Sequence, residues 1–118
     1  MPWKEKLIIA LDVSDAKRAL DIVDMLGDYV GVFKVGFELF VATGPNVVED
    51  IHRKGKMVFL DLKFHDIPNT VSRAAMAAAR LGVYMFNLHT SGGIEMMKKC
   101  RDAVRMYAQK RIWQDLKL

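Results

Sequence analysis

The sequence predicts an α/β fold of four consecutive βα units, which is half of a TIM-type (β/α)8 barrel. Short apolar runs that resemble strands begin near residues 7, 32, 57 and 84, at intervals of about 25 residues, and a helix-like segment follows each. Such a repeat demands a parallel sheet with right-handed crossovers. A closed barrel needs about 250 residues. This chain has 118, so we expect a single (β/α)4 half-barrel domain over residues 1–118.

Polar side chains at the carboxyl ends of the expected strands favour a barrel over a doubly wound sheet. A doubly wound sheet keeps its functional groups at one crevice, whereas the mouth of a barrel collects a contribution from each strand. Every expected strand here contributes at least one polar group, so we expect these groups to face one common mouth. In chain order they are Asp12, Lys34, Asp61, Lys63, Asn87 and His89.

The first half of the chain contains two expected strands, at residues 7–11 and 32–35. Ser14 is suited to cap a helix after the first strand, and Gly27 is suited to end it. A short extra turn is expected at residues 37–42. Gly44 and Pro45 then open another helix, which Gly55 closes. The inward-facing positions of that helix are Val47, Val48 and Ile51.

The second half continues the pattern with a third strand that begins at Met57 and opens the stretch up to Thr70, and with a fourth strand at residues 85–88. An alanine-rich helix is expected from about Pro68 to Leu81, because proline suits the first helical turn. Another helix is expected to begin near Ile94. Residues 105–118 form an atypical tail that extends this last helix rather than starting a fifth strand. The apolar positions of the last helix at helical spacing are Met97, Val104, Ala108 and Ile112.

The third expected strand places an acid and a base on an otherwise apolar face. Side chains alternate along a strand, so Asp61 and Lys63 are predicted to share a face and to lie about 7 Å apart. Burying such charges costs stability unless they pair or are used. With Lys34 and Asp66 they form an alternating set in which carboxylates hold a lysine protonated, as a positioned cation or general acid. Ordinary ion pairs at a sheet rim explain the same residues equally well.

Composition limits the other functional classes. The formal net charge is +4, and the basic residues are scattered, which favours solubilising charge over a nucleic-acid site. The single cysteine, Cys100, excludes an internal disulfide and is expected to be a packing residue in a reducing compartment. No apolar run reaches membrane-spanning length, so we expect a cytoplasmic protein without a membrane partner. The histidines lack metal-ligand spacing, and we expect no metal.

The central stretch closely resembles a known family signature. Asp61-Leu-Lys63-Phe-His-Asp66-Ile67-Pro-Asn-Thr70 is similar to the Asp-x-Lys-x-x-Asp-Ile-Pro-x-Thr motif of orotidine 5′-phosphate decarboxylases. The resemblance extends from about residue 5 to about residue 104. Related phosphosugar enzymes usually follow Asp-x-Lys-x-x-Asp with Ala-Gly and carry a metal-binding glutamate on strand two. Here Pro68 follows Ile67, and Lys34 occupies strand two, which favours the metal-free decarboxylase.

The resemblance implies decarboxylation of orotidine 5′-phosphate to UMP, in pyrimidine biosynthesis, without metal or organic cofactor. It implies that Lys63 donates the proton, that Asp61 faces the substrate carboxylate, and that the enzyme is a homodimer. In such a dimer two residues of each subunit, Asp66 and Thr70, reach the neighbouring site. The implied catalytic residues are Lys63, Asp61, Lys34 and Asp66, and the implied substrate-binding residues are Asp12, Lys34, Ile67 and Thr70.

The chain departs from the family after about Val104, where four more βα units would carry the residues that grip the phosphate. Binding energy from that remote group supports the chemical step, so we expect impaired catalysis. The alternative is a non-catalytic half-barrel fragment or scaffold that associates with itself. An open four-stranded sheet leaves two unpaired edges, so self-association as a dimer or larger assembly is expected on either interpretation.

Overall fold

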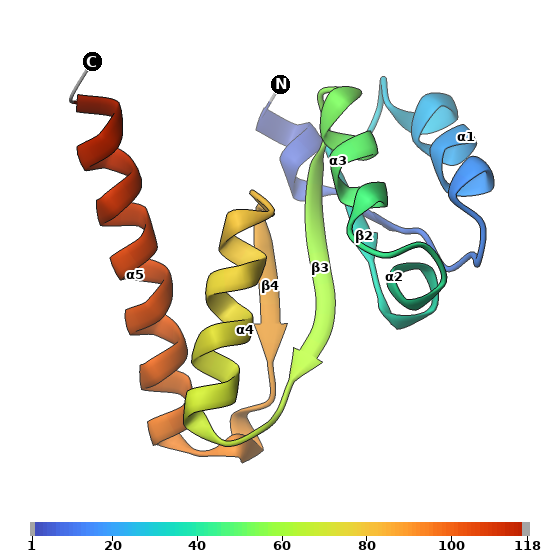
Figure 1. The fold of residues 1–118 in the computed structure, drawn as a ribbon. Coiled ribbons are helices and arrows are strands. Elements are labelled where there is room, and N and C mark those ends of the chain that lie inside the picture. Colours follow the sequence, from blue (N-terminus) through green and yellow to red (C-terminus); the bar gives the residue numbers. More distant parts are fainter. Residues whose placement is uncertain (1, 117–118) are drawn as a thin grey trace. The chain divides into compact units, whose positions relative to one another are not determined.

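The computed structural model describes residues 2–116, with the side chains of residues 3–111 (Figure 1). The described chain forms two compact units. Unit 1 contains the chain up to Leu62 together with Val83–Asn87. Unit 2 contains Lys63–Gly82 together with the segment from Leu88 onward. The single half-barrel domain expected over the whole chain stays a prediction.

The described residues form one four-stranded sheet with the order β1-β2-β3-β4, so that strands consecutive in the chain are neighbours. In the register of the first two parallel pairs, Ile9 lies opposite Phe33 and Phe33 opposite Val58. The parallel four-unit α/β architecture is therefore confirmed, and the second and fourth strands have the predicted bounds. The strands are β1 (Ile8–Ala10), β2 (Val32–Val35), β3 (Met57–Phe64) and β4 (Met85–Leu88).

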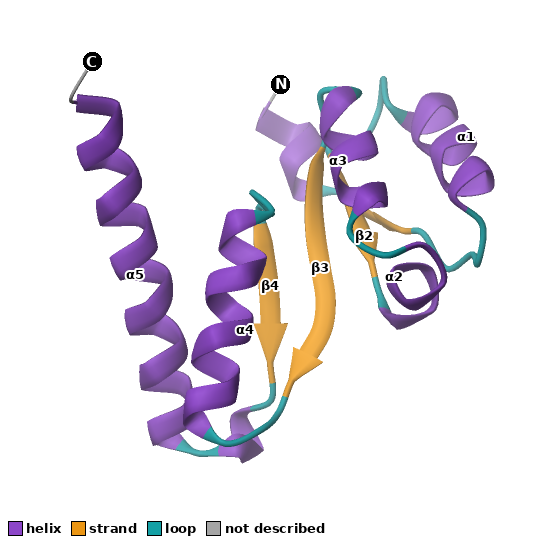
Figure 2. Cartoon of the chain, in the orientation of Figure 1, coloured by secondary structure: helices purple, strands orange, loops and turns teal. Residues whose placement is uncertain are grey.

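Unit 1 contains four helical segments; α2 and α3 lie beside β2 and β3, and α1 packs against α3 (Figure 2). The predicted extra turn is a short helix, α2. The predicted cap of α1 is wrong, because Asp15 caps it by accepting a hydrogen bond from the Lys17 N–H at 2.8 Å. The Ser14 hydroxyl instead donates to Glu38. The segments are η1 (Pro2–Lys6), α1 (Ala16–Leu26), α2 (Phe37–Thr43) and α3 (Asn46–Arg53).

The core of unit 1 lies between one face of the sheet and these helices. Phe33 is the largest of its fully buried side chains, and Val58 and Leu60 of β3 are buried on the same face. The predicted inward positions of α3 are confirmed. Burying these apolar surfaces is the main force that holds β2 and β3 in place. The helical residues of this core are Ala19, Val23, Leu39, Val47, Val48 and Ile51.

Unit 2 consists mainly of α4 (Pro68–Arg80) packed along α5 (Ile94–Leu116), with the short η2 (Thr90–Gly92) before α5. Pro68 occupies the first helical turn as predicted. The helical extension of the tail is confirmed as far as residue 116. The predicted apolar stripe of α5 is only partly right: Ala108 is exposed, and Ile112 lies outside the described side chains. The buried residues are Val71, Ala75, Ala78, Met96, Cys100 and Ala103.

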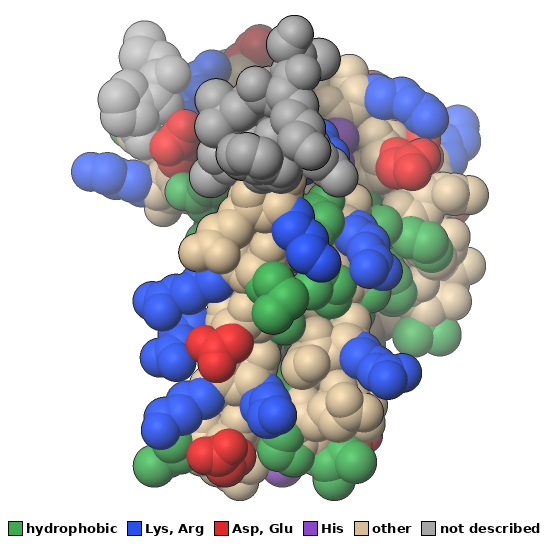
Figure 3. Space-filling model, turned by 60° about the vertical axis from the view of Figure 1, so that its left-hand side comes forward, with side chains coloured by type: hydrophobic (Ala, Val, Ile, Leu, Met, Phe, Trp, Pro, Cys, Tyr) green, Lys and Arg blue, Asp and Glu red, His purple; other side chains and the backbone are tan. Residues whose placement is uncertain are grey.

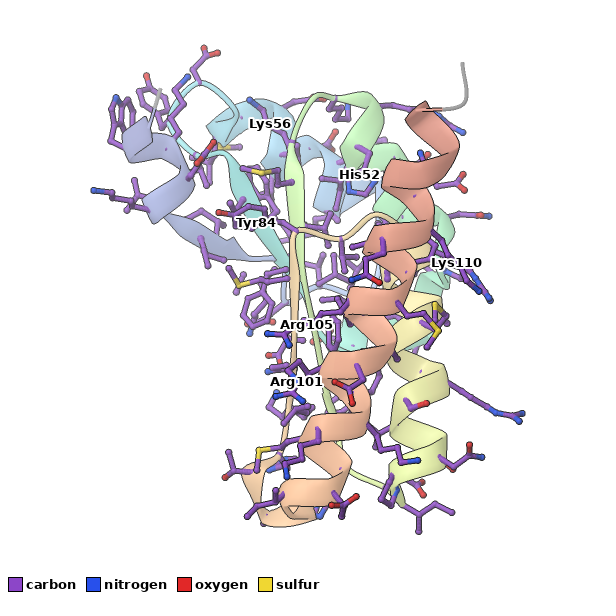
Figure 4. The ribbon with its side chains drawn as sticks, turned by 90° about the vertical axis from the view of Figure 1, so that its left-hand side faces the viewer. His52, Lys56, Tyr84, Arg101, Arg105 and Lys110 are labelled. Atoms are coloured by element: carbon purple, nitrogen blue, oxygen red, sulfur yellow. The ribbon has the colours of Figure 1, made fainter. Side chains whose placement is uncertain are left out.

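Charged side chains are distributed over the surface without one dominant basic patch on the face that Figure 3 presents. Lys and Arg side chains are spread over that face, with Asp and Glu side chains among them mainly along its left edge (Figure 3). On α5, Arg101 and Arg105 project from one side and Lys110 from another (Figure 4). In the described part of the chain, no helix combines the length and the apolar character needed to cross a membrane.

Candidate active site

Lys34 and Asp61 form an ion pair at the carboxyl ends of β2 and β3. Their strands are neighbours in register, with Lys34 opposite Phe59, two residues before Asp61. The Lys34 Nζ lies 3.4 Å from the Asp61 Oδ2, with 26% of the lysine side chain and 9% of the aspartate side chain exposed. A carboxylate so thoroughly desolvated requires a compensating partner. The predicted clustering of these two residues is therefore observed within unit 1.

Asn87, at the end of β4, contacts the same carboxylate from the other side. Its side-chain Nδ2 donates a hydrogen bond of 2.7 Å to the Asp61 Oδ1. Asp61 is thus held between groups from both neighbouring strands. The sequence analysis predicted Asn87 as a polar group at the mouth, because it lies at the carboxyl end of the fourth expected strand, but assigned it no role. The hydrogen bond identifies it as part of the charged cluster.

Asp12 lies at the same end of the sheet, just beyond β1. The Leu11 N–H donates to the Lys34 carbonyl at 2.9 Å, so the chain at Asp12 runs beside the carboxyl end of β2. Asp12 itself is exposed. The loop that follows is tied to α2 by the hydrogen bond from Ser14 to Glu38, of 2.5 Å. Sequence reasoning missed Glu38, since an acid in the first turn of a helix is usually explained by the helix dipole alone.

Lys63 belongs to unit 2 and has an unusual backbone conformation. Its φ is +51°, and among the described residues it is the only non-glycine residue with a positive φ. The left-handed region costs an L-residue about 1–2 kcal/mol, and such strain collects at functional sites. Regular strand alternation therefore stops at Lys63. The predicted common face and 7 Å spacing with Asp61 stay a prediction.

The other motif residues of unit 2 surround the start of α4. The Asp66 Oδ1 accepts a hydrogen bond of 2.7 Å from the Ile67 N–H, and 64% of Ile67 is exposed. Thr70 is exposed in the first turn of α4. Asp66 and Ile67 also line a shallow hollow of about 540 Å³. The remaining lining residues are His65, Pro68, Ser91 and Gly92.

The loops beside this hollow are closely packed. The rings of His65 and His89 lie with centroids 5.1 Å apart. A Cβ at Gly92 would meet the end of the Met96 side chain, which would have to shift to make room for it. Within the described residues, no three or more His, Cys, Asp or Glu side chains are grouped to hold a metal ion. Cys100 packs inside unit 2 as predicted, and burial raises the pKa of its thiol.

The fold and the cluster together define a class: a parallel (β/α) half-barrel with paired charges at the carboxyl ends of its strands, where barrel enzymes keep their chemistry. The chain belongs to the orotidine 5′-phosphate decarboxylase / HUMPS family, whose model matches residues 5–114. The family predicted from the central motif is therefore confirmed.

Individual relatives agree with this assignment. The chain is 49% identical over 110 residues to an orotidine 5′-phosphate decarboxylase from Syntrophomonas wolfei, covering 93% of this chain and 46% of the relative. It is 56% identical over 104 residues to one from Syntrophotalea carbinolica, covering 88% and 43%. The crystal structure of the decarboxylase from Lactobacillus acidophilus matches with a TM-score of 0.77 at 38% identity, covering 86% of this chain and 46% of that one. The chain thus spans slightly less than half the length of the curated relatives it matches.

Proposed function

We propose that the chain carries the catalytic half of an orotidine 5′-phosphate decarboxylase, a carboxy-lyase that forms UMP in pyrimidine biosynthesis without a cofactor. The observation that carries the proposal is the buried pair of Lys34 and Asp61 at the strand ends of a chain of this family. An isolated rim ion pair would be exposed to solvent. This one is nearly enclosed and is reinforced by Asn87.

In the proposed reaction, the bond between C6 and the substrate carboxylate breaks, CO2 leaves, and the electron pair remains on C6. The Lys63 ammonium gives its proton to C6, and its charge stabilises the carbanion-like transition state. Asp61 faces the departing carboxylate. Their repulsion disappears as CO2 forms, so it raises the ground state relative to the transition state.

The remaining motif residues have proposed roles in holding the substrate. Lys34 completes the charge network near the ribose, Asp12 binds a ribose hydroxyl, and Ile67 lines the pyrimidine. Asp66 and Thr70 reach the neighbouring subunit's site in a homodimer. Their exposure on unit 2 supports this role, because residues that serve a partner must be accessible before assembly. The proposal places the protein in the cytoplasm, with neither nucleic acid nor membrane as a partner.

Turnover of orotidine 5′-phosphate, followed by ultraviolet absorbance, tests the proposed function. We expect slow turnover by the unsubstituted chain that Lys63→Ala abolishes, because the proton donor is lost. Lys17→Ala is the matched control, since that side chain is 85% exposed on α1, and we expect it to retain turnover. If the folded, unsubstituted chain has no turnover, the second candidate is favoured: a non-catalytic half-barrel scaffold.

Self-association is proposed for either candidate, because the sheet of unit 1 ends in two open edges. β1 and β4 are the outer strands, and Ile8 and Met85 on them are 41% and 38% exposed. The register aligns Ile8 with Val32 and Met57, which places an apolar row across the sheet. An edge strand with unpaired backbone N–H and C=O groups and apolar side chains favours pairing with a strand of another chain. A second copy could supply them while keeping all strands parallel.

Native mass spectrometry at micromolar concentration checks this expectation. We expect a dimer or a larger assembly, and we expect Ile8→Lys to shift the population towards monomer, since a lysine on an edge strand opposes pairing. Met25→Lys is the control, because Met25 is 71% exposed on α1 and does not belong to an edge strand. A monomeric unsubstituted chain, or equal effects of both lysines, would refute self-association through the edges.

A further inference from the structure

We propose that Asn87 is a positioning residue, which fixes the Asp61 carboxylate in the orientation that the proposed decarboxylation requires. The role rests on the proposed function, in which Asp61 faces the substrate carboxylate. The evidence is that the two oxygens of this carboxylate contact residues on two different strands. Its Oδ1 accepts from the Asn87 amide of β4 at 2.7 Å, and its Oδ2 lies 3.4 Å from the Lys34 ammonium of β2.

The Lys34 contact by itself does not fix the rotation of the carboxylate. The terminal torsion of an aspartate has a broad, roughly two-fold profile, so one ammonium group at 3.4 Å defines its plane poorly. A hydrogen bond to the other oxygen, from the opposite side, removes that freedom. The Asn87 contact has the length of a charge-assisted hydrogen bond to a carboxylate. Because Asp61 is only 6% exposed, water competes little for either oxygen.

The chemistry of an amide suits this position. An asparagine donates at every pH and brings no charge, so it holds Asp61 without weakening the attraction between Asp61 and Lys34. A cation in place of Asn87 would add positive charge beside the carboxylate whose negative charge the proposed mechanism directs at the substrate. A fixed polar network also needs no reorganisation as the reaction proceeds. Asn87 therefore acts through Asp61 rather than on the substrate.

Asn87→Asp tests the inference with almost no change of shape. The variant loses the donor and places a second carboxylate within hydrogen-bond distance of Asp61. Two carboxylates in contact cannot both ionise freely, so the folded variant retains a proton that its unfolded chain releases. A group whose pKa is raised by folding contributes stability at low pH and loses it as pH rises. We expect the deficit in melting temperature, relative to the unsubstituted chain, to widen between about pH 4 and pH 7.

Asn46→Asp is the matched control, because it makes the same change of charge at the exposed first residue of α3. A carboxylate is favoured at a helix N-terminus, so its deficit should not widen with pH. A second measurement avoids the introduced charge. In Asn87→Ala, we expect the carboxyl ¹³C signal of Asp61 to titrate at higher pH than in the unsubstituted chain, because a donor to the ionised form is lost.

The inference is overturned if Asn87→Asp and Asn46→Asp show the same pH dependence and the Asp61 titration does not move in Asn87→Ala. Both readouts are taken without substrate, so they are independent of turnover. If the pH dependence and the Asp61 titration shift as expected in a chain without turnover, the proposed function is contradicted, but Asn87 is shown to fix the Asp61 carboxylate. Turnover without these shifts would contradict the positioning role.

Discussion

Replacing Phe33 with alanine is expected to lower the free energy of unfolding by about 4 kcal/mol, which is typical of a truncated core phenylalanine. Phe33 is fully buried and is the largest such side chain in the described chain. It lies opposite Ile9 of β1 and Val58 of β3, at the centre of the sheet of unit 1. Its removal combines lost apolar burial with a cavity that neighbouring strands cannot close.

Urea denaturation measures this loss, and Phe37→Ala supplies the control. Phe37 begins α2 and is 53% exposed, so the same truncation there should cost less than about 1 kcal/mol. An equally large loss at both positions would show that burial does not set the cost of the truncation. A loss below about 1 kcal/mol at Phe33 would contradict its burial between the strands.

Most elements of the fold were predictable because the chain repeats one pattern. β2 is an apolar run with no competing helical period, and glycines mark the end of α1 and of α4. The cap of α1 was not predictable, because Ser14 and Asp15 are adjacent and both suit an N-cap. The tertiary contact of Ser14 with Glu38 decides between them.

The buried face of α5 shows a different limit. Met96 and Met97 are adjacent, as are Ala103 and Val104, so two apolar stripes at helical spacing are available on one helix. Packing against α4 selects Met96 and Ala103. The spacing of apolar residues predicts that a helix exists, but which side of the helix is buried depends on the element that packs against it.

The charged cluster was partly predictable for a geometric reason. The carboxyl ends of neighbouring parallel strands meet at one edge of a sheet, which brings Lys34 towards Asp61. The Asn87 hydrogen bond depends on the register of β4 against β3 and on the side-chain rotamers, which residue types do not specify. The positive φ of Lys63 has no local signal either, since lysine is not a residue that favours this region.

Lys34→Met is expected to lower the free energy of unfolding by about 2 kcal/mol. The substitution keeps a long side chain but removes the Lys34 ammonium from beside the desolvated Asp61 charge. Breaking a fully buried pair costs about 3–5 kcal/mol, and the partial exposure of Lys34, 26%, reduces that figure. Chemical denaturation near neutral pH measures the difference.

Lys54→Met is the control for this substitution. The Lys54 Nζ is closer to its partner, at 2.8 Å from the Asp24 Oδ1, but 60% of the Asp24 side chain is exposed. Solvent screens that pair, so its loss should cost less than about 1 kcal/mol. If the control lost more stability than Lys34→Met, burial would not be what makes the Lys34 contact important.

The most direct test of the charged cluster is a double-mutant cycle of Lys34→Met and Asp61→Asn, measured by urea denaturation. The asparagine removes the charge but keeps an oxygen to which Asn87 can donate. We expect the double variant to regain most of the stability lost in Lys34→Met, with a coupling free energy above about 1 kcal/mol. If the stability losses of the two single variants add up to the loss of the double variant within about 0.3 kcal/mol, the two side chains do not act on each other. That result would contradict the proposed site.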